Sequence, residues 1–200
     1  MLPTLLFASQ NNNKIIEVQS TLRDVYQIVS LHDVGFTGAL EEPFDTFEAN
    51  AKCKANQGYK IFNLPCFAED AGLVIDSLDG RPGVWSARYA GDQKNVNANI
   101  EKVLRELEGV ADRKAHFIAV IAFFDGAGYQ VFTGTIHGTI LFEPQGLDGF
   151  GYDPIFLPDG YKQSFGELPL AVKNRISHRS IAIRQLIDWL RNTRGVTSRF

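Results

Sequence analysis

The sequence has few cysteines, no long apolar segment and no excess of positive charge, and each absence excludes a class of protein. Its two cysteines, Cys53 and Cys66, form no CxxC pair and lack the spacing of metal ligands. We therefore expect small buried thiols in a reducing, cytoplasmic compartment. The apolar runs are too short to span a bilayer, and no basic region precedes the first of them, so neither a membrane segment nor a signal peptide is expected.

The balance of charge is slightly acidic. Lys and Arg number 20, and Asp and Glu number 23, which leaves a net charge of −3. Such a charge does not attract nucleic acid, so we expect no nucleic-acid partner, and a polyanionic substrate would need a local basic pocket. Hydrophobic residues make up 44% of the 200 residues, which suffices for one large domain or two closely joined lobes.

Segments typical of strands and of helices alternate along the chain. The predicted strands cover residues 4–9, 26–31, 65–70, 73–78, 114–125 and 129–140. The predicted helices cover residues 13–24, 45–62, 97–109 and 177–192. Asp45 and Ser177 are expected to cap the starts of their helices, and Gly109 is expected to end the third. Early crossovers favour parallel strands and the two long middle strands favour an antiparallel pair, so the class is α/β with a mixed sheet.

A polar loop from Ser9 to Glu17 lies between the first predicted strand and the first predicted helix. The free N–H groups and positive dipole end of a helix suit a phosphate, and Ser9, Asn11 and Lys14 would add a hydroxyl, an amide and a cation. Taken alone, the pattern slightly favours an ordinary loop with capping asparagines. It is not a P-loop, because the chain nowhere contains Gly-Lys followed by Ser or Thr.

Two acidic pairs, Glu41–Glu42 and Glu69–Asp70, lie in separate segments. Mg²⁺ typically takes one or two carboxylates together with water and substrate phosphates, so the two pairs could converge on one ion. The usual fate of such pairs is a solvated acidic surface. The position of Glu69 and Asp70 at the end of an apolar strand favours the metal site, because α/β proteins commonly bind ligands there.

Two further segments combine residues suited to a nucleotide base. GLDGFGYDPIF, residues 146–156, surrounds Phe150 and Asp153 with glycines that let backbone approach a ligand, and its rings could stack on a base. KNRISHR, residues 173–179, puts cations at or just before a predicted helix start, where they oppose the helix dipole unless an anion or a carbonyl group lies among them. A structural turn with core aromatics and a solvated basic turn are the alternatives. Without a GxSxG elbow, a serine hydrolase is disfavoured.

Together, and in this order, the four segments resemble the inosine triphosphate pyrophosphatase family, also called XTP/dITP diphosphatases, over nearly the whole chain. Ser9-x-Asn11-x-x-Lys14-x-x-Glu17 is similar to the family's opening phosphate loop, and TFEANAKCKA to its acidic-to-helix segment. EDAGLVIDSLDGRPGVWSARYAG follows its central signature, and GFGYDPIF and KNRISHR are its most specific motifs. The resemblance implies one α/β domain over residues 1–200, with an elongated mixed central sheet flanked by helices and two lobes with the active-site cleft between them.

The resemblance also implies an activity and its residues. It implies Mg²⁺-dependent hydrolysis of ITP, dITP and XTP to the monophosphate and pyrophosphate, which cleanses the nucleotide pool, in an enzyme that is typically a homodimer. Asp70 is the implied catalytic residue, and the implied metal ligands are Glu42, Glu69 and Asp70. The implied substrate-binding residues are Ser9, Gln10, Asn11, Asn12, Asn13, Lys14, Ala71, Phe150, Gly151, Tyr152, Asp153, Lys173, His178 and Arg179.

Within this set, the chemistry of the side chains suggests individual roles. Asp70 would orient or deprotonate the attacking water. His178 and Arg179 would donate to the 6-oxo group of the purine, which adenine lacks, so that adenine would leave buried donors unpaired. Phe150 would stack on the base, and Asp153 or nearby backbone would read its other edge.

Two residues depart from the family's pattern. Ala71 stands where the family commonly has Ser or Thr, so a phosphate contact there can come only from backbone N–H. Glu69 stands where many members have Asp, and it reaches one methylene further. We expect both to alter affinity more than the reaction. A pyrophosphatase for other modified nucleotides and a non-catalytic nucleotide-binding module are the alternatives, and the acidic pairs disfavour the second.

Overall fold

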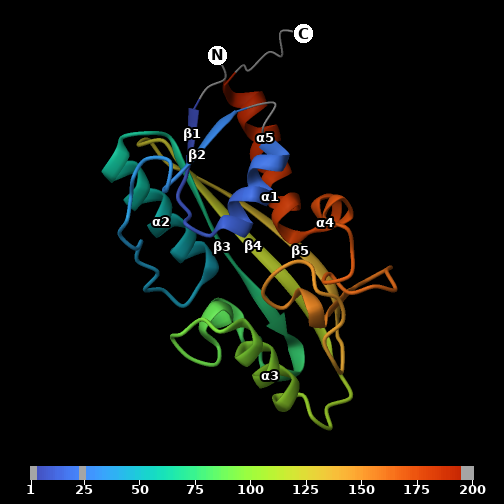
Figure 1. Ribbon diagram of the computed structural model, residues 1–200. Helices are drawn as coiled ribbons and strands as arrows, with labels where there is room; N and C mark the ends of the chain where they lie inside the picture. Colours follow the sequence, from blue (N-terminus) through green and yellow to red (C-terminus); the bar gives the residue numbers. More distant parts are fainter. Residues whose placement is uncertain (1–3, 23–25, 195–200) are drawn as a thin grey trace. The chain divides into compact units, whose positions relative to one another are not determined.

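The computed structural model describes residues 4–22 and 26–194, which form a six-stranded sheet flanked by helices (Figure 1). The strand order is β2-β1-β3-β4-β5-β6. The strands are β1 (Thr4–Phe7), β2 (Gln27–Ser30), β3 (Cys66–Ile75), β4 (Lys114–Phe124), β5 (Tyr129–Ile140) and β6 (Phe156–Pro158). β1 pairs in parallel with β2 and β3, whereas β5 and β6 are antiparallel. The predicted α/β class with a mixed sheet is confirmed.

The described helices match the predicted ones, with one addition, and the last two residues of the first predicted helix, 23 and 24, lie outside the described residues. They are α1 (Asn12–Leu22), α2 (Phe47–Phe62), α3 (Val96–Glu106), α4 (Leu170–Ile176) and α5 (His178–Arg194). The short helix α4 was not predicted, because its seven residues are too few to display a helical period. Ser177 directly precedes α5, where the sequence places the start of the last helix.

Three local predictions need correction. Thr46, not Asp45, is the N-cap of α2, because its hydroxyl accepts the N–H of Ala49 at 3.2 Å. The two strands predicted over 65–70 and 73–78 are the single strand β3, which continues through Ala71 and ends in a 3₁₀ turn. α3 has Leu107 as its C-cap, and Gly109 supplies its positive φ of 73° only in the turn that follows.

The chain forms two compact units. Unit 1 takes its residues from 1–70, 119–134 and 179–200, and unit 2 consists of 71–118 and 135–178. Each of the long strands β3, β4 and β5 therefore contributes one part to each unit. The expectation of a single functional domain with a cleft between two lobes stays a prediction.

Unit 1 is built on close contact between α2 and the strands β1 and β3. A Cβ at Gly58 would lie 2.7 Å from the Sγ atom of Cys66 and 3.2 Å from the Cβ atom of Ala8, so glycine lets the helix approach the sheet. Figure 1 places α2 on one side of these strands and α1 with α5 on the other. Cys66 is buried, as expected, and burial raises its pKa to about 12, whereas the expected burial of Cys53 is wrong because that residue is only partly buried on α2.

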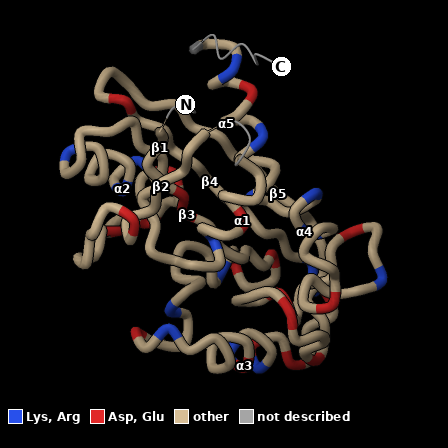
Figure 2. The backbone as a smooth tube through the Cα atoms, turned by 45° about the horizontal axis from the view of Figure 1, so that its top comes forward, with Lys and Arg blue, Asp and Glu red and all other residues tan. Residues whose placement is uncertain are grey.

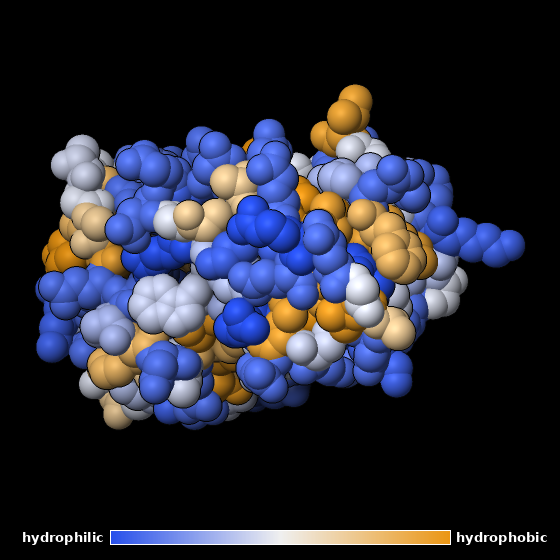
Figure 3. Space-filling model, turned by 90° about the horizontal axis from the view of Figure 1, so that it is seen from below, coloured by the Kyte–Doolittle hydropathy of each residue, from blue (hydrophilic) through white to orange (hydrophobic). Residues whose placement is uncertain are grey.

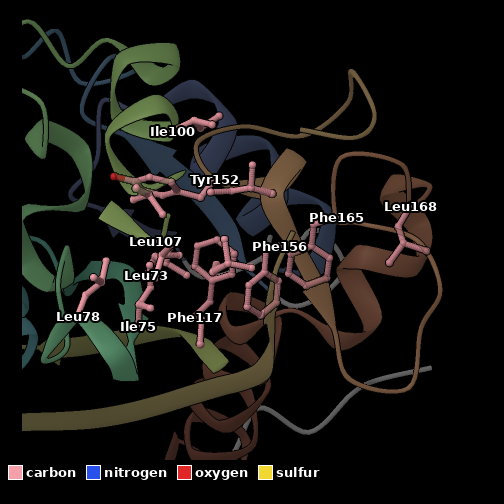
Figure 4. Close-up of a cluster of buried hydrophobic side chains, with 14 residues drawn as sticks. Leu73, Ile75, Leu78, Ile100, Leu107, Phe117, Tyr152, Phe156, Phe165 and Leu168 are labelled. Carbon is pink, nitrogen blue, oxygen red and sulfur yellow. The ribbon is translucent and has the colours of Figure 1, made fainter. Parts of the chain in front are cut away.

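Unit 2 has its own apolar core (Figure 4). Ile100, Val103 and Leu107 come from the face of the third predicted helix that the sequence marks as apolar. Phe156 is central, because its ring lies 4.6 Å from that of Phe117 and 5.3 Å from that of Phe165 between centroids. The full cluster is Leu73, Ile75, Leu78, Ile100, Val103, Leu107, Ala115, Phe117, Ile140, Tyr152, Ile155, Phe156, Phe165 and Leu168.

The surface is mixed in character. Figure 2 shows basic and acidic residues interspersed along the backbone, in keeping with the small net charge. Apolar patches lie among hydrophilic ones on the face drawn in Figure 3. Large hydrophobic side chains that are exposed in unit 2 include Trp85 and Phe142. Within the two described ranges, no helix is long and apolar enough to cross a membrane.

The corrected cap of α2 can be tested by mutation. Thr46→Ala removes the acceptor for a helix N–H, so we expect a loss of about 1 kcal/mol in the free energy of unfolding, measured by urea denaturation. Asp45→Ala is the matched control and should change it by less than about 0.5 kcal/mol. A larger loss in the control than in Thr46→Ala would contradict the assignment.

Candidate active site

The acidic end of β3 holds two adjacent carboxylates, and the strand separates them. Successive residues in a strand point to opposite faces of the sheet. Glu69 contacts Arg179 of α5, whereas Asp70 contacts Lys54 of α2. Since α2 and α5 cover opposite sides of these strands (Figure 1), each carboxylate has a cation of its own. The repulsion expected between neighbouring acids is thereby avoided.

On one side, Arg179 is held by two carboxylates. Its Nε and Nη2 atoms each donate to Glu69 at 2.8 Å, and Nη1 donates to Glu17 of α1. Only 2% of Arg179 is exposed. Burial lowers the pKa of the guanidinium, but the two carboxylates outweigh burial and raise that pKa above its ordinary value. The predicted contact between Arg179 and a purine stays a prediction.

The loop before α1 is organised by its own side chains. The hydroxyl of Ser9 accepts the N–H of Asn11 at 3.2 Å, and the Oδ1 atom of Asn11 accepts the N–H of Lys14 at 3.2 Å. Gln10 donates to the carbonyl of Phe36 at 3.3 Å. These bonds are those of a capped strand-to-helix loop, the alternative that the sequence left open. A phosphate role for the loop stays a prediction.

Three further side chains of this loop lie at the start of α1. Asn12 and Asn13 are exposed in the first turn of α1, where backbone N–H groups lack helical partners. The Nζ atom of Lys14 lies 3.9 Å from the Oε1 atom of Glu69. Burial lowers the pKa of Lys14, and Glu69 counters part of that effect. Substrate contacts by these three residues stay predictions.

On the other side of the sheet, Asp70 is fixed by α2. Its Oδ1 atom lies 3.4 Å from the Nζ atom of Lys54, and its Oδ2 atom accepts from the amide of Asn50 at 3.1 Å. Lys54 also donates to Glu42 in a close ion pair. Burial raises the pKa of Asp70 above its ordinary value, and the ammonium groups of Lys54 and Lys14 reverse this only in part. Such a carboxylate suits proton transfer.

The donor set around Lys54 is chemically suited to a hard divalent cation. Glu42 and Asp70 already share one positive group, and Mg²⁺ typically uses one or two carboxylates with water and substrate phosphates. Both oxygens of Glu69 accept from Arg179 instead. Among residues 4–22 and 26–194, no group of three or more His, Cys, Asp or Glu side chains could hold a metal by itself. The metal ligands stay a prediction.

In unit 2, the glycine-rich segment is anchored by a buried ion pair. The Nζ atom of Lys173 lies 2.6 Å from the Oδ2 atom of Asp153, which also accepts the N–H of Phe150 at 2.7 Å. Lys173 lies over the ring of Phe150, 4.6 Å from its centroid. A Cβ at Gly149 would fall 2.3 Å from the carboxylate of Asp153, so glycine is required. The segment therefore presents Phe150 on a fixed loop.

Two other predicted substrate residues of unit 2 are part of its interior. The hydroxyl of Tyr152 donates to the carbonyl of Ser86 at 2.9 Å, and burial raises the pKa of Tyr152 above its ordinary value. The ring of His178 stacks on that of Phe117, with 4.9 Å between centroids. Tyr152 thus also has the structural role that the sequence left open, and base contacts by both residues stay predictions.

The basic motif lies at and just before the start of α5, as expected. His178 and Arg179 are in the first turn of α5. Lys173 and Arg175 precede that start, and they also lie in the last turn of the unpredicted helix α4, where cations are favourable. Gly151 follows Phe150 with a φ of 62°, and Ala71 follows Asp70 within β3.

Sequence reasoning gave no role to Asn50, Lys54 and Glu17. Asn50 and Lys54 are four residues apart on the buried face of α2, beside Ala51 and Ala55. Polar residues within a stripe of small buried residues are a usable signal, because burying them requires partners. Glu17 is the last residue of the motif that begins at Ser9, but its partner, Arg179, is 162 residues away in the sequence.

Known proteins are similar to this chain over nearly its whole length. The sequence pattern of the Ham1 family matches residues 5–189. The dITP/XTP pyrophosphatase of Christiangramia forsetii is 47% identical over 93% of this chain and 98% of its own, and that of Flavobacterium johnsoniae is 46% identical over 95% and 99%. A HAM1 protein from Coxiella burnetii has a similar structure, with a TM-score of 0.88, 38% identity and coverage of 96% and 100%.

The buried guanidinium should be required for stability. Arg179→Met leaves two buried carboxylates without their partner, so we expect a loss of about 3–5 kcal/mol in the free energy of unfolding by urea denaturation. Arg175→Met is the matched control, because Arg175 is exposed, and it should cost less than about 0.5 kcal/mol. An Arg179→Met protein as stable as the wild type would show that the pairing of Arg179 with Glu17 and Glu69 does not stabilise the fold.

Proposed function

The chain belongs to the Ham1 family, and we propose that it is a dITP/XTP pyrophosphatase that removes non-standard purine nucleoside triphosphates, ITP included, from the nucleotide pool. The relatives that carry this name match it over more than nine-tenths of its length. The observation in the structure that supports the proposal best is Asp70. It is a buried carboxylate with a raised pKa, held between Lys54 and Asn50 at the end of an apolar stretch.

In the proposed reaction, water attacks the α-phosphorus, and the bond to the bridging oxygen of the pyrophosphate breaks. Asp70 orients the water and accepts its proton, for which a raised pKa is suitable. Lys14, with the N–H groups at the start of α1, binds the phosphate oxygens. Bound Mg²⁺ would supply charge neutralisation of the triphosphate, and Glu42 and Asp70 would hold it. Glu69 would act on the site mainly by holding Arg179 and Lys14 in position.

Recognition of the base is assigned to residues with the matching chemistry. Phe150 offers a ring whose loop is fixed by Asp153 and Lys173. His178 is the proposed donor to a 6-oxo purine, since its ring is held in place by stacking on Phe117. Adenine carries a donor at the same position and would leave this group unpaired.

The proposal is tested by pyrophosphate release with Mg²⁺ from dITP, XTP and ITP beside ATP, GTP and dUTP. We expect the non-standard purines to exceed ATP in kcat/KM by about 10²-fold or more. The same assay without divalent cations should give no turnover. Equal rates with dITP and ATP would contradict the assigned specificity, and preference for another modified nucleotide would favour a related pyrophosphatase.

A catalytic-site variant controls for contaminating activity. Asp70→Asn keeps the size of the side chain and its contact with Asn50 but cannot accept the proton. We expect kcat to fall by about 10²–10⁴-fold while the protein still binds the nucleotide. A variant with full kcat would exclude Asp70 as the catalytic residue.

We also propose that the enzyme is a cytoplasmic homodimer. Trp85 and Phe142 are 56% and 82% exposed, and large exposed hydrophobic groups are common at subunit contacts. The thiols of Cys53 and Cys66 are free, as in a reducing compartment. Multi-angle light scattering should give twice the chain mass of 22.3 kDa. A monomer at micromolar concentration would contradict the dimer.

A further inference from the structure

The ammonium group of Lys54 lies where a metal ion shared by Glu42 and Asp70 would have to lie. It is in a close ion pair with the Oε1 atom of Glu42 and is 3.4 Å from the Oδ1 atom of Asp70. We propose that Lys54 is a built-in counter-ion that keeps this carboxylate pair closed to a divalent cation until a nucleotide binds. The inference rests on the proposed function and specifies how its metal site is regulated.

Asp70 needs a positive partner in this position. Asp70 is 8% exposed and Lys54 is 6% exposed, so water screens their charges poorly. Asp70 cannot turn away, because its other oxygen is held by Asn50. Asn50 is itself fixed, since its side chain accepts the N–H of Phe44 and donates to the carbonyl of Phe44, both at 2.9 Å. Lys54 supplies the positive charge to a rigid acceptor.

The ammonium group and a divalent cation cannot occupy this position together. Mg²⁺ binds carboxylate oxygens at about 2.0–2.1 Å, and Lys54 contacts one oxygen of each carboxylate, Oε1 of Glu42 and Oδ1 of Asp70. A dication next to an ammonium group would also be repelled. Lys54 must therefore withdraw before both carboxylates can ligate a metal.

Lysine is suited to such a withdrawal, in contrast to the arginine on the other side of the strand. Lys54 carries a point charge on a flexible four-carbon stem. Arg179 grips Glu69 with a planar fork and two parallel hydrogen bonds, a geometry that is lost if either group moves. Of two neighbouring acids, Glu69 thus has a fixed partner and Asp70 a movable one.

The phosphate groups of a nucleotide would offer Lys54 an alternative partner. Phosphate oxygens are strong acceptors for an ammonium group, so a triphosphate beside Glu42 and Asp70 would exchange partners with Lys54 and release the carboxylates to the metal. The metal and the nucleotide then bind cooperatively, and each raises the affinity for the other by the same factor. Without a nucleotide, the metal affinity stays low.

The test measures Mn²⁺ binding without nucleotide, by the EPR signal of free Mn²⁺, in the full chain. Lys54→Met removes the charge and keeps the length of the stem, so we expect the Kd for Mn²⁺ to fall at least about tenfold relative to the wild type. Lys52→Met is the matched control on the same helix, because the described contacts of Lys52 are with Glu48 and the ring of Tyr129 and not with Glu42 or Asp70, and it should leave the Kd unchanged. Adding Glu42→Gln to Lys54→Met should abolish the gain.

An unchanged or larger Kd in Lys54→Met overturns the proposal, as does an equal gain in Lys52→Met. If circular dichroism shows that Lys54→Met is unfolded, Lys54→Gln repeats the test, because its amide is a neutral hydrogen-bond donor and removes the charge. The role of Lys54 and the proposed function are refuted by different results. Wild-type enzyme that releases pyrophosphate from dITP while Lys54→Met gains no Mn²⁺ affinity refutes only the role of Lys54, whereas wild-type enzyme without such release refutes the proposed function.

Discussion

The pairing of one buried guanidinium with two carboxylates holds the acidic end of unit 1 together. Arg179 joins the start of α5 to Glu17 in α1 and to Glu69 in β3, over sequence separations of 162 and 110 residues. A buried cation is costly unless its hydrogen bonds are satisfied, and the planar fork of arginine satisfies them against Glu69. With Glu69 and Glu17 fixed, the positions of Lys14 in the same helix as Glu17, and of Asp70 next along the strand, are fixed as well.

The alternation of side chains along β3 turns an unfavourable pair of acids into two different sites. Glu69 points to the side of α1 and α5, and Asp70 points to the side of α2. Glu69 is paired with the planar guanidinium of Arg179. Asp70 is paired with Lys54 and keeps a raised pKa. Unit 2 also contains a buried ion pair, in which Lys173 and Asp153 fix the loop of Phe150.

Much of the fold and of the candidate site could be predicted from local patterns. The strand-helix order, the mixed sheet, the apolar face of α3 and the burial of Cys66 follow from periodicity and composition. The cap of α2 was misplaced by one residue, because Asp45 and Thr46 are both good N-caps and only backbone geometry distinguishes them. Helix α4 was missed because seven residues carry too little periodic signal, so the sequence did not show that Lys173 and Arg175 also lie in the last turn of a helix.

The order of its motifs assigns this chain to its family, because ordered residue types at set spacings are properties of the chain itself. The partners of those residues are not such properties. That Arg179 grips Glu69, and that Lys54 lies between Glu42 and Asp70, depends on which helix covers which face of β3. Contacts between residues that are 12 to 162 positions apart arise only when the packed core brings their elements together. Tertiary packing therefore decided that Glu69 pairs with Arg179 and Asp70 with Lys54.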